Sequence, residues 1–554
     1  MRAPAPARYL FAPALALAWG LVLMLSAGSV AAQVLVFADG FESGDTRAWC
    51  APDCLPSCPA LTVTPGTVVV QETPLPMRAV AWSDASCAPR EAVMVDQRSN
   101  GAGYLRRYTY RVGAADRVCT GLDGGAIQGM GYVTNHLGDP CDFAGCPWGN
   151  WTPATPGTTS VVLAGPHHVI LEYAMPGYQL AGRTIPTTVQ WFFATGRSHP
   201  LFALTQDARA HTAGNFGADS RSPYGAMEFP GDDSAGLPIA GVSWGDTYKF
   251  VSVVPGTTDE STLLASWSGW RYDEPNSIPY VLAWTTGVDA EQGTVATSPI
   301  WFQDHGSDPR EWPVTGFGKG QQDLDGPLPL DDDWAYQLMN YPDVPSGGTT
   351  DKKIAWGTDV GSLGGFDNWW PAGGWNLQEY SLHRDSTTPW SGSREHGLLL
   401  AYSTFVVFGT HDGGYLDGAT GRVVREMENV QLATLTAAVG AVRAQGPRGV
   451  GSAGDAIVTY SPAGYNHVYA TWEVDAAGSG ADFTLGVADG YPLESPVFVV
   501  HGYTSGAPPA SLALDGAPAV ADVDYFATLE AANQRLWLTV PRTVASTLQV
   551  QLTP

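Results

Sequence analysis

Short apolar runs alternate with turn residues along most of the chain. From Leu61 onward these runs are rich in β-branched and aromatic residues and are bounded by glycine, proline, asparagine or aspartate, as in LTVTPGTVVV, HHVILEYAM and IPYVLAWTTG. This pattern is typical of strands joined by tight turns. Residues Arg422 to Val442 fit a helix or a strand, and their β-branched content favours a strand. We therefore predict an all-β protein built on a large antiparallel β-sandwich.

Two sandwich domains are expected from this pattern, because 554 residues exceed what one compact core usually spans. The main domain, with aromatic-rich loops, is predicted over residues 61–445. A glycine-rich stretch, GPRGVGSAGD, then leads into a smaller C-terminal β-sandwich over residues 452–554, where AIVTY, HVYATWEV and LWLTV alternate apolar and polar positions. A barrel would give the same alternation, whereas a propeller would need a repeat of about 40–50 residues, which is not present.

The N-terminus has the pattern of a secretory signal peptide over residues 1–32. Arg2 and Arg8 precede an apolar core, and small residues up to Ala32 form the cleavage site. Residues 33–60 follow as a short segment with a cysteine-rich linker, and its DGFESGD stretch resembles a segment at the ends of many secreted bacterial proteins. We expect a mature chain that is secreted or periplasmic and has no membrane span.

The strongly acidic balance limits the partners of the protein. A formal charge of -26 repels phosphate backbones, so nucleic acid is excluded as a partner, and anionic membranes are disfavoured. A local basic cleft for an anionic polymer would still be compatible with this net charge. Four arginines that are close in sequence are candidates for it, although four separate surface arginines is the favoured interpretation: Arg183, Arg197, Arg209 and Arg221.

All seven cysteines lie within the first 146 residues. In an exported protein this indicates disulfides, and we expect one bond between Cys141 and Cys146 and a second between Cys87 and Cys119. The odd number leaves one thiol that is free, bound to a partner or lost by processing. Zinc is not favoured, because the cysteines do not form paired CxxC units with histidines at matching intervals.

A loop region between Trp356 and His396 concentrates tryptophans among glycine, proline and charged residues. We predict that Trp369, Trp370 and Trp375 stack on sugar rings, since indole faces suit the apolar faces of sugars. Polar side chains at the edges of the rings would add hydrogen bonds, and Asp367 and His305 are the candidates. The alternative is a hydrophobic lid over one end of a sheet.

The same region carries a candidate catalytic group. A lyase that acts on uronic acids needs a base for the C5 proton, a proton donor for the leaving oxygen and an arginine that neutralises the carboxylate. Histidines, tyrosines and a glutamate are the candidate bases and acids, and arginines are the candidate neutralising groups. The candidate residues are His383, Tyr380, Arg384, Glu379, His199, Tyr224 and Arg221. A glycoside hydrolase would instead pair two carboxylates from among Asp304, Asp367, Glu379, Asp385 and Glu395.

One acidic stretch, DLDGPLPLDDDW, has the donor chemistry of a cation site. Carboxylates suit a hard cation, so calcium is the expected cofactor, with an unliganded acidic loop as the alternative. The predicted ligands are Asp323, Asp325, Asp331 and Asp333. The GxSxG pattern around Ser243 is read as a chance match, because a strand rather than a helix follows it.

In strand texture and in its tyrosines, histidines and arginines, the segment 61–445 resembles the sandwich cores of polysaccharide lyases and galactose-mutarotase-like enzymes. The resemblance implies a supersandwich fold and a secreted enzyme that cleaves a polysaccharide substrate, by β-elimination on a uronic-acid-containing glycan. A glycoside hydrolase with paired carboxylates and a non-catalytic carbohydrate-binding surface protein are the alternatives. The sequence leaves the oligomeric state open.

Overall fold

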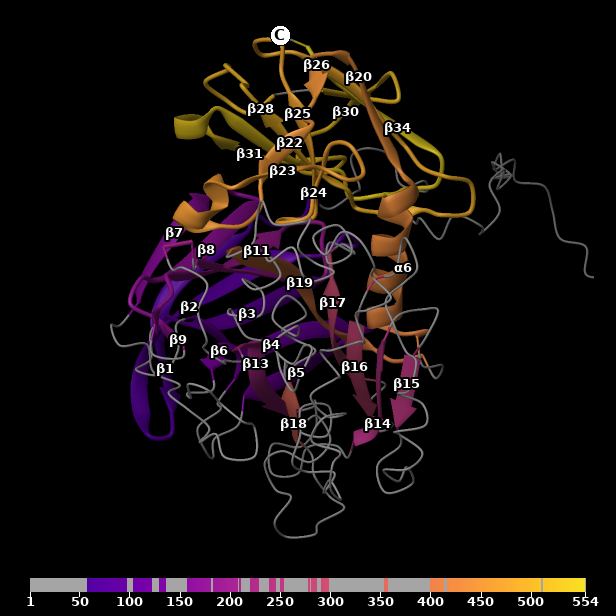
Figure 1. The fold of residues 1–554 in the computed structure, drawn as a ribbon. Helices are drawn as coiled ribbons and strands as arrows, with labels where there is room; N and C mark the ends of the chain where they lie inside the picture. Colours follow the sequence, from indigo (N-terminus) through magenta and orange to yellow (C-terminus); the bar gives the residue numbers. More distant parts are fainter. Residues whose placement is uncertain are drawn as a thin grey trace, which may run out of the picture. The chain divides into compact units, whose positions relative to one another are not determined.

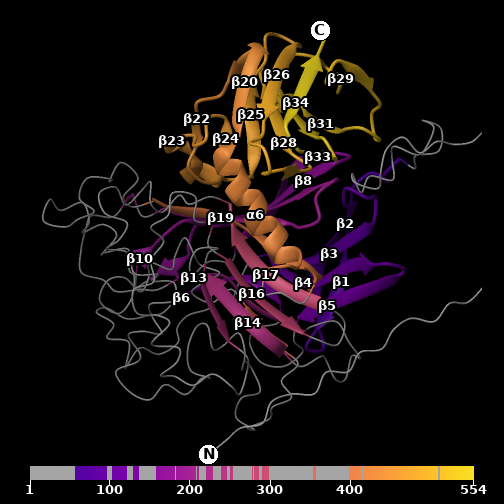
Figure 2. The ribbon, with the colours of Figure 1, turned by 90° about the vertical axis from the view of Figure 1, so that its right-hand side faces the viewer.

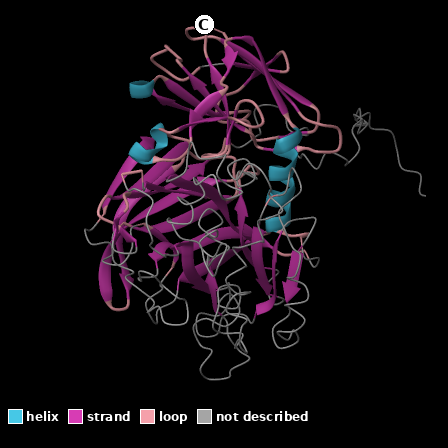
Figure 3. Cartoon of the chain, viewed as in Figure 1, coloured by secondary structure: helices cyan, strands magenta, loops and turns pink. Residues whose placement is uncertain are grey.

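The computed structural model describes most of the two predicted sandwich regions. The described ranges are 57–96, 103–121, 129–135, 157–180, 183–207, 209–210, 220–228, 239–245, 250–253, 278, 280–285, 290–297, 353–356, 399–412, 416–509 and 512–553. Strands dominate these residues, so the all-β prediction is confirmed (Figure 3).

Two large sheets are built from the first part of the chain, and all their strand pairs are antiparallel. The eight-stranded sheet has the order β1 (Thr62–Val70), β2 (Thr73–Ser83), β3 (Pro89–Val95), β4 (Tyr104–Val112), β5 (Ala115–Gly121), β13 (Ser220–Glu228) and β18 (Lys353–Trp356), with β6 (Met130–Asn135) paired to β13 and β4. The nine-stranded sheet has the order β15 (Phe250–Val253), β14 (Ile239–Gly245), β16 (Tyr280–Thr285), β17 (Ala290–Ala296), β19 (Leu399–Thr410), β12 (Leu201–Asp207), β11 (Thr187–Ala194), β8 (His168–Met175) and β7 (Thr158–Ala164).

Aromatic side chains pack these two sheets face to face. Trp82 on β2 meets Phe193 on β11, with ring centroids 5.2 Å apart, and Tyr108 on β4 stacks on Phe408 of β19 at 4.6 Å. Such rings bury a large apolar area and contribute geometry-specific contacts. The predicted sandwich is therefore present.

Two smaller sheets follow at the C-terminal end of the chain, in orange and yellow in Figure 1. One has the order β20 (Thr434–Val439), β26 (Ala481–Gly486), β34 (Thr547–Leu552), β29 (Leu512–Leu514) and β30 (Ala517–Ala519). The other has the order β21 (Ala441–Val442), β25 (Thr471–Asp475), β28 (Val497–His501), β32 (Arg535–Thr539) and β31 (Phe526–Glu530), with β24 (Tyr465–Asn466) paired to β25. Strands β25 and β28 are parallel, and Phe483 packs on Phe498 between the sheets at 5.0 Å.

Three short strand pairs and two short 3-10 helices are also present. The pairs are β9 (Gln179–Leu180) with β10 (Arg183–Thr184), β22 (Gln445–Pro447) with β23 (Ile457–Thr459), and β27 (Leu493–Glu494) with β33 (Thr543–Val544). The 3-10 helices are η8 (Gly451–Asp455) and η9 (Ala531–Asn533).

Strand β11 is buried on both of its faces. The indole of Trp191 points toward the eight-stranded sheet and donates to the carbonyl of Gly103 at 3.0 Å. The next residue, Phe192, points the other way and meets Trp537 of β32 at 5.4 Å. Side chains on a strand alternate between its two faces, so the nearly unbroken apolar run of β11 reflects its contact with both the N-terminal and the C-terminal sheets. One hydrophobic core cluster accordingly includes residues from both parts of the chain.

A helix, α6 (Ala419–Leu432), packs against β16, β17 and β19 (Figures 1 and 2). It also contacts β27. The preference for a strand from Arg422 was therefore wrong up to Leu432 and holds from Thr434, where β20 begins. The buried residues of α6 include Val423, Val424, Met427 and Val430, whose spacing defines one helical face. This tertiary contact outweighs the weak strand preference of the valines.

A disulfide joins Cys58 to Cys87, with Cα atoms 5.1 Å apart. The predicted bond between Cys87 and Cys119 was wrong, because Cys119 is a free, fully buried thiol of β5 that accepts a hydrogen bond from Gln292 at 3.8 Å. Cys87 lies instead in the turn that links β2 to β3. The predicted bond between Cys141 and Cys146 concerns residues outside the described ranges.

Replacing Cys87 by serine is expected to lower the free energy of unfolding by about 3 kcal/mol, because the disulfide closes a loop of 29 residues in the unfolded chain. Denaturant unfolding of the variant and of the wild type with and without reductant measures this loss. Reductant should lower the stability of the wild type by more than it lowers the stability of the variant, because only the wild type has the Cys58–Cys87 bond to lose. Equal stability of the oxidised and reduced wild type would contradict the expectation.

Among the described residues, no helix is long and apolar enough to cross a membrane.

Candidate acid–base pocket

Most of the predicted site residues fall outside the described ranges. These are the tryptophan-loop and acid–base candidates His305, Asp367, Trp369, Trp370, Trp375, Glu379, Tyr380, His383 and Arg384, and the acidic-loop residues Asp323, Asp325, Asp331 and Asp333. Their roles stay predictions, as does calcium. Within the described part of the chain, no group of three or more His, Cys, Asp or Glu residues is placed to hold a metal ion.

Three predicted catalytic residues are described, and they belong to different sheets. Arg221 and Tyr224 lie on β13 of the eight-stranded sheet, where the pairing with β6 is irregular between them. His199 lies in the loop that joins β11 to β12 of the nine-stranded sheet. A pocket with titratable side chains surrounds His199, and we describe the candidate site from this residue outward.

The loop from Thr195 to Pro200 is fixed by hydrogen bonds from the facing sheet. The indole of Trp82 donates to the carbonyl of Arg197 at 2.8 Å, and the hydroxyl of Tyr108 donates to the carbonyl of Ser198 at 2.6 Å. Gly196 allows the required left-handed turn, with φ of 93°, and a Cβ there would come within 2.8 Å of Thr539. The backbone that carries Arg197 and His199 is thus held rigidly.

The pocket has a volume of about 250 Å³, and its titratable side chains come from three segments of the chain. The fixed loop contributes Arg197, Ser198 and His199, helix α6 contributes Arg422 and Glu426, and strand β27 contributes Glu494. This volume lies just below the range of about 300–1,000 Å³ typical of small-molecule sites, which suits one ring-sized unit of a ligand.

Arg197 contributes a cation with spare hydrogen-bonding capacity. Its Nη2 donates to the carbonyl of Ala470 at 3.0 Å, and its guanidinium lies 5.5 Å from the ring centre of Phe405. Its Nε and Nη1 are buried and have no hydrogen-bond partner among the described residues. Burial lowers the pKa of Arg197, and the charge of Glu426 opposes that shift. A guanidinium remains protonated in proteins, so it offers N–H donors to an anionic ligand.

The imidazole of His199 is neutral at ordinary pH. Burial lowers its pKa well below the usual value, and the positive charges of Arg90 and Arg422 lower it further. Arg90 is itself held in place, because its Nη2 contacts Asp84 at 3.1 Å and its Nη1 donates to the hydroxyl of Tyr108 at 3.3 Å. The Nδ1 atom of His199 is buried without a partner in the part of the chain that is described. An unprotonated nitrogen is available to accept a proton.

Glu426 is the third titratable group of the pocket. Burial raises its pKa to about 7, the positive charge of Arg197 opposes this rise, and the negative charge of Glu494 adds to it. At neutral pH the carboxyl group is therefore close to half protonated. A group in this state can donate or accept a proton, which is what general acid–base catalysis requires.

Sequence reasoning identified one of the three groups. His199 was found because it stands in a polar, turn-like setting. Arg197 was assigned to the surface, but it is only partly exposed and lines the pocket, whereas Arg209 is exposed and pairs with Asp207. Glu426 was missed because its segment was assigned to a strand. An amphipathic pattern with a carboxylate at the margin of the apolar face was the available signal.

Comparison with protein-family models found no match, and comparison with curated proteins found none at a significant level.

Proposed function

We propose that this pocket is the active site of a secreted carbohydrate-active enzyme that cleaves a uronic-acid-containing polysaccharide by β-elimination. The observation that carries the proposal is the buried guanidinium of Arg197, with two unpartnered N–H groups, in one pocket with the neutral His199 and the protonatable Glu426. A guanidinium complements a carboxylate in charge and donates charge-assisted hydrogen bonds to it. An arginine, a base and an acid are the three groups that elimination from a uronide needs.

The proposed step balances within these groups. Arg197 binds the carboxylate of the uronic acid and stabilises the negative charge that develops there when the C5 proton leaves. His199 takes the C5 proton, the C4–O4 bond breaks and a double bond forms between C4 and C5. Glu426 gives its proton to the departing O4, so the products are a new hydroxyl end and an unsaturated uronide. The bound carboxylate would also raise the proton affinity of His199 by adding a nearby negative charge.

Export is part of the proposal. The signal-like N-terminus favours it, and the Cys58–Cys87 disulfide fits an oxidising compartment.

A glycoside hydrolase is the second candidate, and one observation favours it. Glu494 lies close enough to Glu426 for its charge to raise the pKa of that residue. Two carboxyl groups in one pocket, one of them with a raised pKa, are typical of a glycosidase. This mechanism does not require a uronic acid, so a hydrolase would accept neutral glycans.

The test is an assay of the mature protein from Gln33 on acidic and neutral polysaccharides, with ultraviolet absorbance and reducing ends read together. Both signals should rise on an acidic glycan. A rise in reducing ends alone would indicate a glycoside hydrolase. No rise in either signal, with retained binding, would indicate a non-catalytic carbohydrate-binding protein.

Replacing Arg197 by methionine is expected to lower kcat/KM on the acidic glycan about 10²–10³-fold, because the carboxylate loses its neutralising group. Arg209→Met is the matched control, since Arg209 belongs to the same stretch of sequence and is exposed. The control should keep wild-type activity. An Arg197→Met protein that is folded and fully active would refute the assignment of the carboxylate site.

A further inference from the structure

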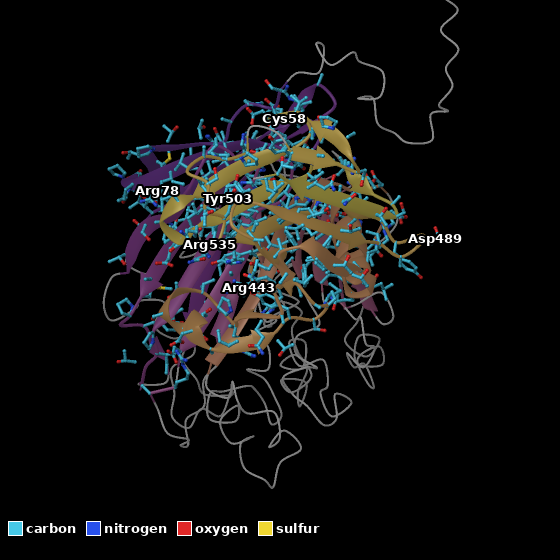
Figure 4. The ribbon with its side chains drawn as sticks, turned by 90° about the horizontal axis from the view of Figure 1, so that it is seen from above. Cys58, Arg78, Arg443, Asp489, Tyr503 and Arg535 are labelled. Carbon is cyan, nitrogen blue, oxygen red and sulfur yellow. A yellow bond between two sulfur atoms is a disulfide. The ribbon has the colours of Figure 1, made fainter. Side chains whose placement is uncertain are left out.

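A second pocket lies on the C-terminal sheets and uses none of the acid–base residues. Its volume is about 300 Å³. Three basic and three aromatic residues stand in its wall: Arg443, His501, Arg535, Tyr460, Tyr469 and Trp537. Figure 4 labels Arg443 and Arg535 on this part of the chain. The pocket is thus roomy enough for one ring-sized ligand and combines polar with apolar walls.

The two arginines are fixed by their own acidic partners. Nη1 of Arg443 lies 2.8 Å from a carboxylate oxygen of Asp475, and Nη2 of Arg535 lies 2.7 Å from one of Glu530. Nε of Arg535 is buried and has no hydrogen-bond partner among the residues described. Each guanidinium is therefore oriented and still has N–H groups that are not used by its ion pair.

The third basic residue is paired in the same way. Nε2 of His501 donates to the carboxylate of Glu473, which also accepts hydrogen bonds from Asn466 at 2.9 Å and Thr471 at 2.8 Å. Burial alone would raise the pKa of Glu473, but these hydrogen bonds, that of His501 first, bring it below its usual value. The carboxylate is thus ionised and accepts three hydrogen bonds within the protein.

The carboxylates around this pocket are already paired, Asp475 with Arg443, Glu530 with Arg535 and Glu473 with His501. An ionic ligand would therefore have to compete with these existing pairs, and it would lose its own hydration on entry. A neutral ligand with many hydroxyl groups has no such cost. Its oxygens can accept hydrogen bonds from the oriented guanidinium groups, and charge-assisted hydrogen bonds of this kind are strong.

The apolar part of the wall fits the other property of a sugar. Tyr469 is partly buried, and its hydroxyl donates to Oε1 of Gln190 at 2.6 Å, which fixes its ring in the pocket wall. A sugar ring presents C–H groups that pack on such surfaces and hydroxyl groups at its edge. We propose that this pocket binds one neutral sugar unit of a polysaccharide. Such binding would not depend on the reaction at the acid–base pocket.

The test is calorimetric titration of the protein carrying Glu426→Gln, which suppresses turnover at the other pocket. The probes are oligosaccharides of glucose, galactose, mannose and xylose, with oligogalacturonate as the acidic comparison. We expect one neutral series to bind at one site per chain. Arg443→Ala should weaken that binding about 10–100-fold, because hydrogen bonds from a charged donor are lost.

Arg542→Ala is the matched control, since Arg542 is also an arginine of the C-terminal sheets that pairs with an aspartate, Asp515. It should bind the sugar as the parent protein does. Two results would overturn the proposal: no neutral series binds, or Arg443→Ala binds the sugar as tightly as the control. Binding of oligogalacturonate alone that is sensitive to Arg443→Ala would show an anion site instead. A failure of the elimination reaction would leave these outcomes unchanged, because binding is measured without turnover.

Discussion

Glu426→Gln is expected to lower kcat on the acidic glycan about 10²–10⁴-fold, because the amide cannot give a proton to the leaving oxygen. The pH profile of the wild type should also have a limb near pH 7, since burial raises the pKa of Glu426 to about 7. On this limb kcat/KM falls as the pH rises, because the protonated carboxyl is the acid. The variant should lack this limb. Measured pH profiles of kcat/KM for both proteins test this expectation.

The same substitution, Glu426→Gln, should lower the activity but raise the stability of the protein at high pH. The pKa of this carboxyl is higher in the folded protein than in the unfolded chain. Its contribution to stability is therefore fully present at pH values below the pKa of the unfolded chain, and it is lost as the pH rises from there through about 7. Glutamine is neutral at every pH, so Glu426→Gln should raise the free energy of unfolding above pH 8 by up to about 3 kcal/mol. Little difference is expected below pH 4.5. Denaturant unfolding at several pH values measures the effect.

Glu428→Gln is a suitable control, because residues two positions apart point to opposite sides of a helix and Glu428 does not line the pocket. The control should keep both the activity and the pH limb. Loss of activity in Glu426→Gln together with lower stability at high pH would indicate a structural role and would count against an acid role. Such an outcome would move the proton donor to another residue.

The sequence pattern predicted the strands well, because β-branched and aromatic runs between turn residues carry local information. It failed at α6, where the helix depends on contacts of Val424 and Met427 with strands distant in sequence. The prediction of a Cys87–Cys119 disulfide was wrong for a related reason. The partner of Cys87 depends on where the chain places Cys58 at the entry to the sheet, and the spacing of the cysteines does not reveal this.

The candidate site shows the same limit. His199 was recognisable from its neighbours, whereas Glu426 acquires its pKa only when the sandwich buries it beside Arg197. Residues 197, 426 and 494 are far apart in sequence and meet in one pocket through tertiary packing. Periodicity and composition do not contain that information, so sequence reasoning yields the scaffold and one member of the site.

The position of Glu426 depends on how α6 begins, and a buried carboxylate from the sheet controls that point. Glu291 on β17 is fully buried and accepts hydrogen bonds from the backbone N–H of Thr420, in the first turn of α6, and from Nδ1 of His411 at 2.8 Å. The residue before the helix, Gly418, makes no side-chain cap. A Cβ at that position would come within 2.1 Å of the Glu291 carboxylate. Glu291 thus satisfies the helix N-terminus and complements its positive end.

Replacing Glu291 by alanine is therefore expected to cost about 3–5 kcal/mol of unfolding free energy, because His411 and the first turn of α6 would lose their partner inside the core. Glu291→Gln keeps an acceptor for Thr420 and should cost only about 1–2 kcal/mol. Denaturant unfolding ranks the two variants. Because α6 carries Glu426, the alanine variant should also lose activity on the acidic glycan at temperatures where it is still folded, and the glutamine variant should lose less. Wild-type stability of the alanine variant would show that the carboxylate does not hold the helix start, and Glu426 would then owe its position to the apolar face of α6 alone.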